Sequence, residues 1–413
     1  MINRQRKMSL FSLLGAAVAG GAMIAAAAQG AAAQGDGTAA PEPTAREREL
    51  AQLETGKGAN GMFVYIGTYS KGGSKGIYVY RLDGKTGQLT DTGQTAEAQN
   101  PSFVELHPNG RFLYAVSEGG KSGAVSAFAI NAETGGLTFL NQQSSHGTSP
   151  CHLSVDATGK LLTVANYSSG TVAALPVQDD GKLGEATSVK KHEGSSVNPQ
   201  RQKEPHAHSC TIDAANRFAF AADLGLDKIL VYRLDVEKGE LTPNEVPFAA
   251  VHPGAGPRHF AFHPSNRYGY VINEIDSTIT AFTYDAEEGA LNEIHSLSTL
   301  PADYSGKNSC ADIHIDPAGK FLYGSNRGHD SIVIYSIDEA TGRLTLVGHE
   351  STQGRTPRNF GLDPTGSFLL AANQDTNNVV VFRVDQKTGR LTPTGQSIEV
   401  PSPVCVKFLQ SRS

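Results

Sequence analysis

Seven similar blocks follow one another along most of this chain. Each block contains an apolar strand, a short turn with Pro, Gly or Asn, a second apolar strand that ends in a small polar residue, and a third strand followed by Asp-x-x-x-Gly-x-Leu. The second strands are centred at Tyr65, Tyr114, Thr163, Phe220, Tyr270, Tyr323 and Leu370, which are 49, 49, 57, 50, 53 and 47 residues apart. Strand repeats of this length indicate a solenoid or a propeller, because one small sheet cannot bury its faces alone.

The two ends of the repeat region supply complementary parts of one block. Met62–Tyr69 has the character of a second strand with no first strand before it, whereas Ser402–Leu409 resembles a first strand with no second strand after it. Pairing of these two segments completes one blade and closes a ring. The sequence therefore predicts an all-β fold: a seven-bladed β-propeller of four-stranded blades, closed by the C-terminal strand, which completes the N-terminal blade.

The beginning of the chain differs in composition from the repeats. Arg4, Arg6 and Lys7 precede an Ala-rich apolar run at 10–28, and small residues follow the run. This layout is typical of a secretory signal peptide, and its Ala and Gly content favours cleavage over the alternative, a permanent transmembrane anchor. The chain accordingly divides into three segments: a signal peptide (1–33), a disordered leader (34–60) and the propeller domain (61–413).

The mature protein is acidic. The chain has 35 basic and 41 acidic residues, and loss of the three basic residues of the signal peptide leaves a net charge of 32 − 41 = −9. A negatively charged exported protein is poorly suited to bind nucleic acid or an anionic membrane surface. We therefore expect a periplasmic or secreted monomer that binds no nucleic acid and, once the signal is removed, no membrane.

The four cysteines match neither a metal site nor a disulfide framework. Each lies in the first strand of a different repeat, at Cys151, Cys210, Cys310 and Cys405, and no two form a Cys-x-x-Cys pair. Strands of separate blades are too far apart for a disulfide, which needs Cα atoms within about 7 Å. We expect buried free thiols, no metal and no cofactor; the lack of tryptophan also disfavours a quinone-dependent dehydrogenase.

The repeated Asp-x-x-x-Gly segment, first seen at Asp83 and Gly87, has part of the pattern of a calcium loop. The further ligands that such a loop needs at alternate positions are missing. Because the segment recurs in nearly every block, it is better explained as the outer hairpin turn of a blade.

Chemistry is expected where the blocks differ, because residues common to all copies hold the blades together. In antiparallel strands, the start of each first strand and the end of each second strand lie at the same face of the ring. Three columns at this face vary widely and contain these charged or imidazole side chains: Glu118, His152, His208, Arg258, His259, Glu274, Arg327 and Arg358. We predict that they reach one mouth of the central channel.

Three neighbouring blades bring an imidazole, guanidinium groups and a carboxylate to this mouth. Guanidinium groups bind carboxylate or phosphate bidentately and stabilise the oxyanion that forms during acyl attack. The structural alternative is that these residues form salt bridges between blades and strand-end hydrogen bonds. A basic segment at 190–203, between the third and fourth blocks, is either a lid over the mouth or a solvated loop.

Several motifs resemble those of the seven-bladed propeller lactonase family, which contains bacterial 6-phosphogluconolactonases and fungal 3-carboxymuconate lactonising enzymes. The motifs are Arg201-Gln202, Pro205-His206-Ala207-His208, Asp223-Leu224-Gly225, Gly256-Pro257-Arg258-His259, Tyr270-Val271-Ile272-Asn273-Glu274 and Ser325-Asn326-Arg327-Gly328-His329-Asp330. The resemblance spans about residues 61–409.

The resemblance implies lactone chemistry at a site made of a histidine, two arginines and a glutamate. By motif, the catalytic residues are His208 (or His206), Arg258, Arg327 and Glu274. The predicted substrate-binding residues are His152, His206, His259, Glu118 and Arg358.

The predicted enzyme is a carboxylic ester hydrolase that acts on a small anionic sugar-acid lactone, as a 6-phosphogluconolactonase does, without a metal. Its arginines bind the anionic group, while His208 and Glu274 divide the acid–base work in an order that the residues leave open. The alternatives are a muconate-type lactonising cycloisomerase and a non-catalytic exported propeller that scaffolds partners.

Overall fold

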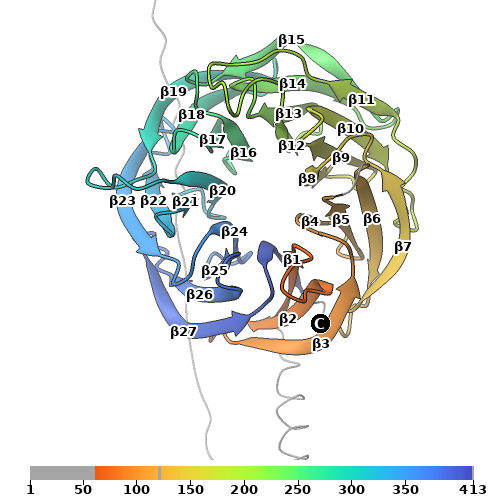
Figure 1. Ribbon diagram of the computed structural model, residues 1–413, viewed down its shortest axis with the longest axis vertical. Helices are drawn as coiled ribbons and strands as arrows, with labels where there is room; N and C mark the ends of the chain where they lie inside the picture. The colour runs from red at the N-terminus through yellow and green to blue at the C-terminus, as the bar shows by residue number, and fades with distance from the viewer. Residues whose placement is uncertain (1–60, 120–121, 412–413) are drawn as a thin grey trace, which may run out of the picture. The chain divides into compact units, whose positions relative to one another are not determined.

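The computed structural model describes residues 61–119 and 122–411 of the chain. These residues form 28 strands in seven four-stranded antiparallel sheets, arranged as blades around a central axis (Figure 1). The predicted seven-bladed propeller is therefore confirmed. The predicted signal peptide (1–33) and leader (34–60) lie outside the described residues.

The second and third strands of each blade carry most of the buried apolar residues. The innermost strands, which line the channel, are β28 (Pro403–Gln410), β4 (Val104–Leu106), β8 (Pro150–Val155), β12 (Ala207–Ile212), β16 (Pro257–Phe262), β20 (Ser309–Ile315) and β24 (Pro357–Leu362). The second strands are β1 (Gly61–Thr68), β5 (Phe112–Ser117), β9 (Leu161–Asn166), β13 (Phe218–Asp223), β17 (Tyr268–Asn273), β21 (Phe321–Arg327) and β25 (Phe368–Asn373). Every residue of β9, β13, β17 and β25 is buried, because a blade packs on each face of these strands.

Solvent reaches the blades mainly at their outermost strands, whereas the third strands are largely buried. The third strands are β2 (Gly76–Asp83), β6 (Ala124–Ile130), β10 (Thr171–Pro176), β14 (Lys228–Asp235), β18 (Thr278–Asp285), β22 (Ser331–Ile337) and β26 (Asn378–Val384). The outermost strands are β3 (Leu89–Glu97), β7 (Leu137–Ser144), β11 (Ser188–Lys191), β15 (Glu240–Ala250), β19 (Ala290–Ser298), β23 (Leu344–Ser351) and β27 (Leu391–Glu399).

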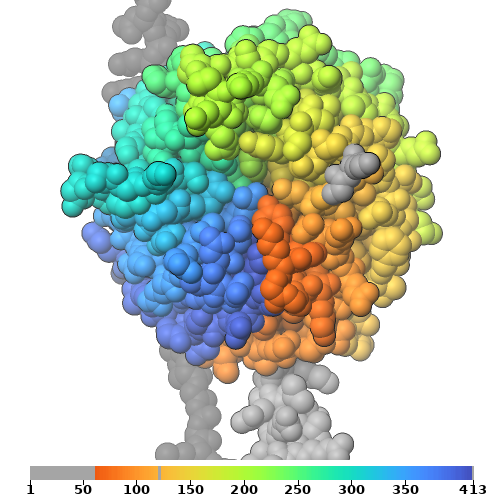
Figure 2. All heavy atoms as spheres, viewed as in Figure 1, coloured from red at the N-terminus to blue at the C-terminus, as the bar shows by residue number. Residues whose placement is uncertain are grey.

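The ring is closed by the C-terminal strand. β28 pairs with β1 in antiparallel register from Met62 opposite Gln410 to Thr68 opposite Pro403. The first blade therefore has the order β28-β1-β2-β3 and joins the two ends of the repeat region, as predicted. In the space-filling view the N-terminal and C-terminal segments of the propeller pack directly against each other (Figure 2).

The outer hairpin turns are the repeated Asp-x-x-x-Gly segments. Asp83 Oδ1 accepts hydrogen bonds from the backbone N–H groups of Lys85 at 2.9 Å and Thr86 at 2.8 Å. The carboxylate thus satisfies the turn that joins β2 to β3, and the interpretation as a hairpin turn is confirmed.

These turns also hold neighbouring blades together. Gly135, in the turn between β6 and β7, has φ of 72° and lies under the ring of Phe63 in β1. The hydroxyl of Tyr65, two residues along β1, donates to the Gly135 carbonyl at 3.0 Å. The same tyrosine–glycine bond recurs between other pairs of blades: Tyr114 to Gly181, Tyr270 to Gly342, and Tyr323 to Gly389.

Substitution of Gly135 by alanine should destabilise the protein more than the same change at Gly93. Both glycines have positive φ, but a Cβ at Gly135 would lie 2.5 Å from the Phe63 ring, whereas a Cβ at Gly93 meets nothing within 4 Å. We expect about 1 kcal/mol for Gly93→Ala from backbone strain, and about 1–3 kcal/mol more for Gly135→Ala from overpacking. Urea unfolding measures both free energies, and equal losses would contradict the role of this contact.

Candidate active site

The four predicted catalytic residues meet at one mouth of the channel. His208 lies near the start of β12 and Arg258 near the start of β16, whereas Glu274 directly follows β17 and Arg327 ends β21. The pairing of β16 with β17 brings Arg258 beside Glu274, because the two strands are antiparallel and meet at this end. The structure therefore gathers residues from blades 4, 5 and 6 at one point.

The carboxylate of Glu274 is the centre of this group. Its Oε2 lies 3.0 Å from Arg258 Nε and 2.8 Å from Arg327 Nη2, and its Oε1 lies 2.5 Å from Arg201 Nη2. His208 Nε2 lies 3.9 Å from Oε2, too far for a direct hydrogen bond. Glu274 is only 6% exposed, so its negative charge is balanced by these arginines and not by water.

The protonation states of Glu274 and His208 follow from this setting. Burial raises the pKa of the Glu274 carboxyl, but Arg327 and Arg258 outweigh it and hold that pKa well below its usual range. Burial, together with the charge of Arg258, lowers the pKa of His208 well below 6.5. At neutral pH the site therefore combines an ionised carboxylate with a neutral imidazole, and Glu274 has no proton to donate.

Arg258 is buried with more positive than negative charge around it. It is 2% exposed, and its Nη1 donates to the Ala311 carbonyl at 2.5 Å. Burial and the nearby charges of Arg327 and Arg358 lower the pKa of Arg258 to about 10, which leaves it protonated at neutral pH. An anionic ligand in this mouth would relieve the repulsion among the guanidinium groups.

Two further predicted residues, Glu118 and Arg358, border the same mouth beside Tyr69. The Glu118 carboxylate accepts hydrogen bonds from the Tyr69 hydroxyl at 3.0 Å and from the Ser102 hydroxyl. The Arg358 guanidinium lies 5.3 Å from the centre of the Tyr69 ring. Among the residues that the structure describes, Arg358 has no hydrogen-bond or ion-pair partner, so its guanidinium is available to a ligand.

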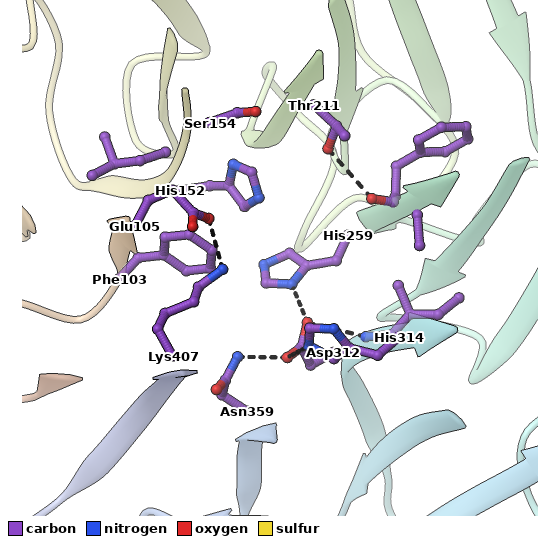
Figure 3. A pocket seen from close by; sticks show the side chains of 14 residues that line it. Phe103, Glu105, His152, Ser154, Thr211, His259, Asp312, His314, Asn359 and Lys407 are labelled. Carbon is purple, nitrogen blue, oxygen red and sulfur yellow. Dashed lines mark hydrogen bonds and ion pairs between the residues drawn. The ribbon is translucent and has the colours of Figure 1, made fainter. Parts of the chain in front are cut away.

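The three other predicted histidines are placed differently from His208. His206 stacks on the Tyr167 ring, with ring centroids 4.4 Å apart, and its Nδ1 faces the Tyr167 carbonyl at 3.1 Å. His152 and His259 line a cavity of about 180 Å³ in the channel, together with Asp312 (Figure 3), and His259 also borders the small cavity lined by Arg258 and Arg358. Of the histidines proposed for catalysis, the structure therefore places His208, and not His206, next to Glu274.

Arg201 is a member of the site that the repeat pattern did not reveal. It lies in the long connection between β11 and β12, outside the columns that vary between blocks, and only its place in a family motif drew attention to it. The neighbouring Gln202 donates from Nε2 to Asp227 Oδ1 at 2.7 Å and to the Leu224 carbonyl at 2.8 Å. These bonds attach the basic segment to blade 4 and so position Arg201 next to Glu274.

The structure shows the state of the four cysteines and the arrangement of possible metal ligands. Cys151, Cys210, Cys310 and Cys405 are all free and buried, which confirms that prediction. In residues 61–119 and 122–411, no group of three or more His, Cys, Asp or Glu side chains is arranged to hold a metal ion. The same residues contain no helix with the length and apolarity needed to span a membrane.

The buried neutral histidines predict a loss of stability in mild acid. Burial lowers the pKa of His152 and His208 well below 6.5 and that of His259 to about 4. Between those pKa values and pH 6.5, the unfolded chain binds more protons than the folded protein does. The contribution of the neutral histidines to the free energy of unfolding is therefore fully present above pH 6.5 and declines as the pH falls. Each histidine contributes up to about 1.4 kcal/mol per pH unit.

Urea unfolding at pH 7, 6 and 5 measures this dependence. The variant His152→Gln should show a smaller decline in the free energy of unfolding than the wild type, and the same substitution at the exposed His146 serves as the control. A free energy of unfolding that does not change between pH 7 and pH 5 would show that these histidines are not held neutral.

Comparison with known proteins identifies the family of this chain. The family described as "Lactonase, 7-bladed beta-propeller" matches residues 63–408. A 6-phosphogluconolactonase of Bacillus subtilis is 41% identical over 345 residues, which are 84% of this chain and 97% of that protein. A 6-phosphogluconolactonase of Formosa agariphila is 38% identical over 306 residues, covering 73% of this chain and 86% of that protein.

Solved structures with the same fold are similar to most of this chain. The periplasmic gluconolactonase of Pseudomonas aeruginosa superposes with a TM-score of 0.81 at 33% identity, covering 85% of this chain and all of that one. A protein from Lactobacillus plantarum superposes with a TM-score of 0.79 at 34% identity, covering 84% of this chain and 99% of that one. With its seven closed blades and its cluster of arginines at the mouth, the chain belongs to the family of seven-bladed β-propeller lactonases.

Proposed function

We propose that this protein hydrolyses a sugar-acid lactone, as its relatives named 6-phosphogluconolactonase and gluconolactonase do, and that this lactone carries an anionic group, as 6-phosphogluconolactone does. One observation carries the proposal: a neutral His208 stands beside an ionised Glu274 that is surrounded by Arg201, Arg258 and Arg327. A neutral imidazole accepts a proton from water, and guanidinium groups stabilise an oxyanion.

His208 is the general base in this proposal. Its Nδ1 faces the thiol sulfur of Cys151 at 3.6 Å, and with the proton on Nδ1 the Nε2 lone pair is free to accept. Nε2 takes a proton from water as the water oxygen attacks the lactone carbonyl carbon. Glu274, which remains ionised and lies 3.9 Å from the same Nε2, stabilises the imidazolium that forms through its negative charge.

The arginines stabilise the charge that develops on the substrate. The carbonyl oxygen becomes negative in the tetrahedral intermediate, and Arg258 and Arg327 neutralise it. When the intermediate collapses, the bond between the carbonyl carbon and the ring oxygen breaks, and the ring oxygen takes the proton back from His208. The products are the open-chain hydroxy acid, which loses its acidic proton to solvent, and the free enzyme.

Arg358 binds the anionic end of the substrate in this proposal. It faces the same small cavity as Arg258 and Glu118, and no protein carboxylate is paired with it among the described residues. A phosphate or carboxylate in this position forms the bidentate contact that a guanidinium group provides.

Replacement of Arg258 should reduce lactone hydrolysis strongly. We expect Arg258→Ala to lower kcat/KM by about 10²- to 10³-fold, because it removes a donor to the oxyanion. The exposed Arg343→Ala is the matched control and should retain wild-type activity. Hydrolysis by the mature protein is measured on a panel of gluconolactone, 6-phosphogluconolactone and a muconolactone.

Each alternative function gives a distinct result on this panel. Full lactone turnover by Arg258→Ala would refute the assignment of the site. Conversion of a muconate without hydrolysis of sugar lactones would favour a lactonising cycloisomerase, and no turnover of any compound would favour a non-catalytic scaffold.

The protein is proposed to act outside the cytoplasm as a monomer, after removal of residues 1–33. The basic start, apolar run and small residues of this segment support the proposal. Expression of the full chain in a bacterium should yield a periplasmic form whose N-terminus, measured by mass spectrometry, lies near residue 34. A full-length protein that stays with the membrane fraction would indicate an uncleaved anchor.

A further inference from the structure

Beneath the mouth, one buried carboxylate accepts hydrogen bonds from several side chains that line the channel. Asp312, in β20, is 3% exposed and accepts hydrogen bonds from His259 Nδ1 at 2.7 Å, from His314 Nε2 at 2.9 Å and from the Asn359 side-chain amide (Figure 3). The backbone N–H of Ile313 adds another bond at 3.0 Å. Both carboxylate oxygens are thus occupied by donors from three neighbouring blades.

The orientation of Asn359 is itself set by the strand that closes the ring. Asn359 Oδ1 accepts a hydrogen bond from the backbone N–H of Val406, in β28, at 2.7 Å. The amide must therefore present its NH₂ group to Asp312, because its oxygen is already committed. Asp312 thus faces donors only, as an ionised carboxylate requires.

The ionised Asp312 determines which nitrogen of His259 carries the proton. Burial raises the pKa of the Asp312 carboxyl, but His314 and His259 outweigh it and hold that pKa well below its usual range. Burial and the charge of Arg258 lower the pKa of His259 to about 4, so its imidazole is neutral at neutral pH. With its single proton on Nδ1, facing Asp312, His259 keeps a lone pair on Nε2.

That lone pair faces the catalytic guanidinium. Arg258 Nη1 lies 3.2 Å from His259 Nε2 and also donates to the Ala311 carbonyl, while Arg258 Nε donates to Glu274. Two edges of the guanidinium are therefore fixed by the protein. Nη2 has no partner among the described residues, and it belongs to a side chain that lines the mouth cavity with Arg358.

We propose that Asp312 and His259 are positioning residues: Asp312 holds His259 in the tautomer whose Nε2 accepts from Arg258, and this bond fixes the guanidinium with Nη2 directed at the substrate. The inference rests on the proposed function, and it reassigns His259 from substrate contact to support of Arg258. It is supported by the fact that both ring nitrogens of His259 already have protein partners.

Two substitutions of His259 separate its two bonds. Glutamine places its amide near the position of Nε2 and can still accept from Arg258, whereas asparagine reaches only the position of Nδ1 and keeps the bond to Asp312. We expect His259→Asn to lower kcat/KM for lactone hydrolysis about 10- to 100-fold and His259→Gln to lower it less than about fivefold. Glu105→Gln, which changes a carboxylate in the same cavity away from Arg258, is the control and should stay within about twofold of wild type.

The same substitutions in an Arg258→Ala background test whether His259 acts through Arg258. If it does, His259→Asn causes no further loss in that background, since the group it positions is absent. An equal loss in both backgrounds, or a loss in His259→Gln as large as in His259→Asn, would overturn the inference. Thermal unfolding of each variant checks that the fold is kept.

The tautomer is measured independently of catalysis. In ¹⁵N-histidine-labelled wild-type protein at pH 7, the signals missing from His259→Gln belong to His259 and should show a protonated Nδ1 and a bare Nε2. A proton on Nε2 would overturn the inference even if lactones are hydrolysed. Absence of any lactone turnover would refute the proposed function. The positioning role of His259 would then be decided by its tautomer and by whether its Nε2 signal shifts in Arg258→Ala.

Discussion

Antiparallel pairing of β28 with β1 is the interaction on which the rest of the molecule depends. An open row of blades exposes an apolar face at each end, whereas a closed ring buries every face and leaves no free inner edge. Closure also gives the innermost strands a common axis, so residues far apart in sequence share one channel. A series of hydrogen bonds also links the closing strand to Arg258, from Val406 through Asn359, Asp312 and His259.

The mouth of the channel holds charge that the protein only partly neutralises. Glu274 serves as the counter-ion for Arg201, Arg258 and Arg327. Arg358 has Tyr69 and Glu118 nearby but no hydrogen-bond or ion-pair partner among the residues that the structure describes. Burial of unpaired charge is costly, which supports the proposal of a binding site over that of a purely structural ion-pair cluster. The deeper layer differs, because there Asp312 has all of its acceptors satisfied and acts as support.

Particular residues show how far sequence reasoning reached at the site. Glu274 and Arg258 were identified because antiparallel strands bring their ends together, and this rule needs no coordinates. His208 was preferred to His206 although both occur in one motif, and the structure shows that their side chains have different neighbours. Arg201 escaped the repeat pattern because it lies in a connection whose path depends on Asp227.

The sequence by itself determined the seven blades, the closing strand, the outer turns and the columns that face the mouth. All of these follow from period, strand alternation and turn chemistry, which are local properties of the chain. Only the tertiary structure decided which side chains touch, and with that the charge on Glu274 and the neutrality of His208. Those properties depend on burial and on partners from other blades, which come within a few ångströms only when the ring is closed.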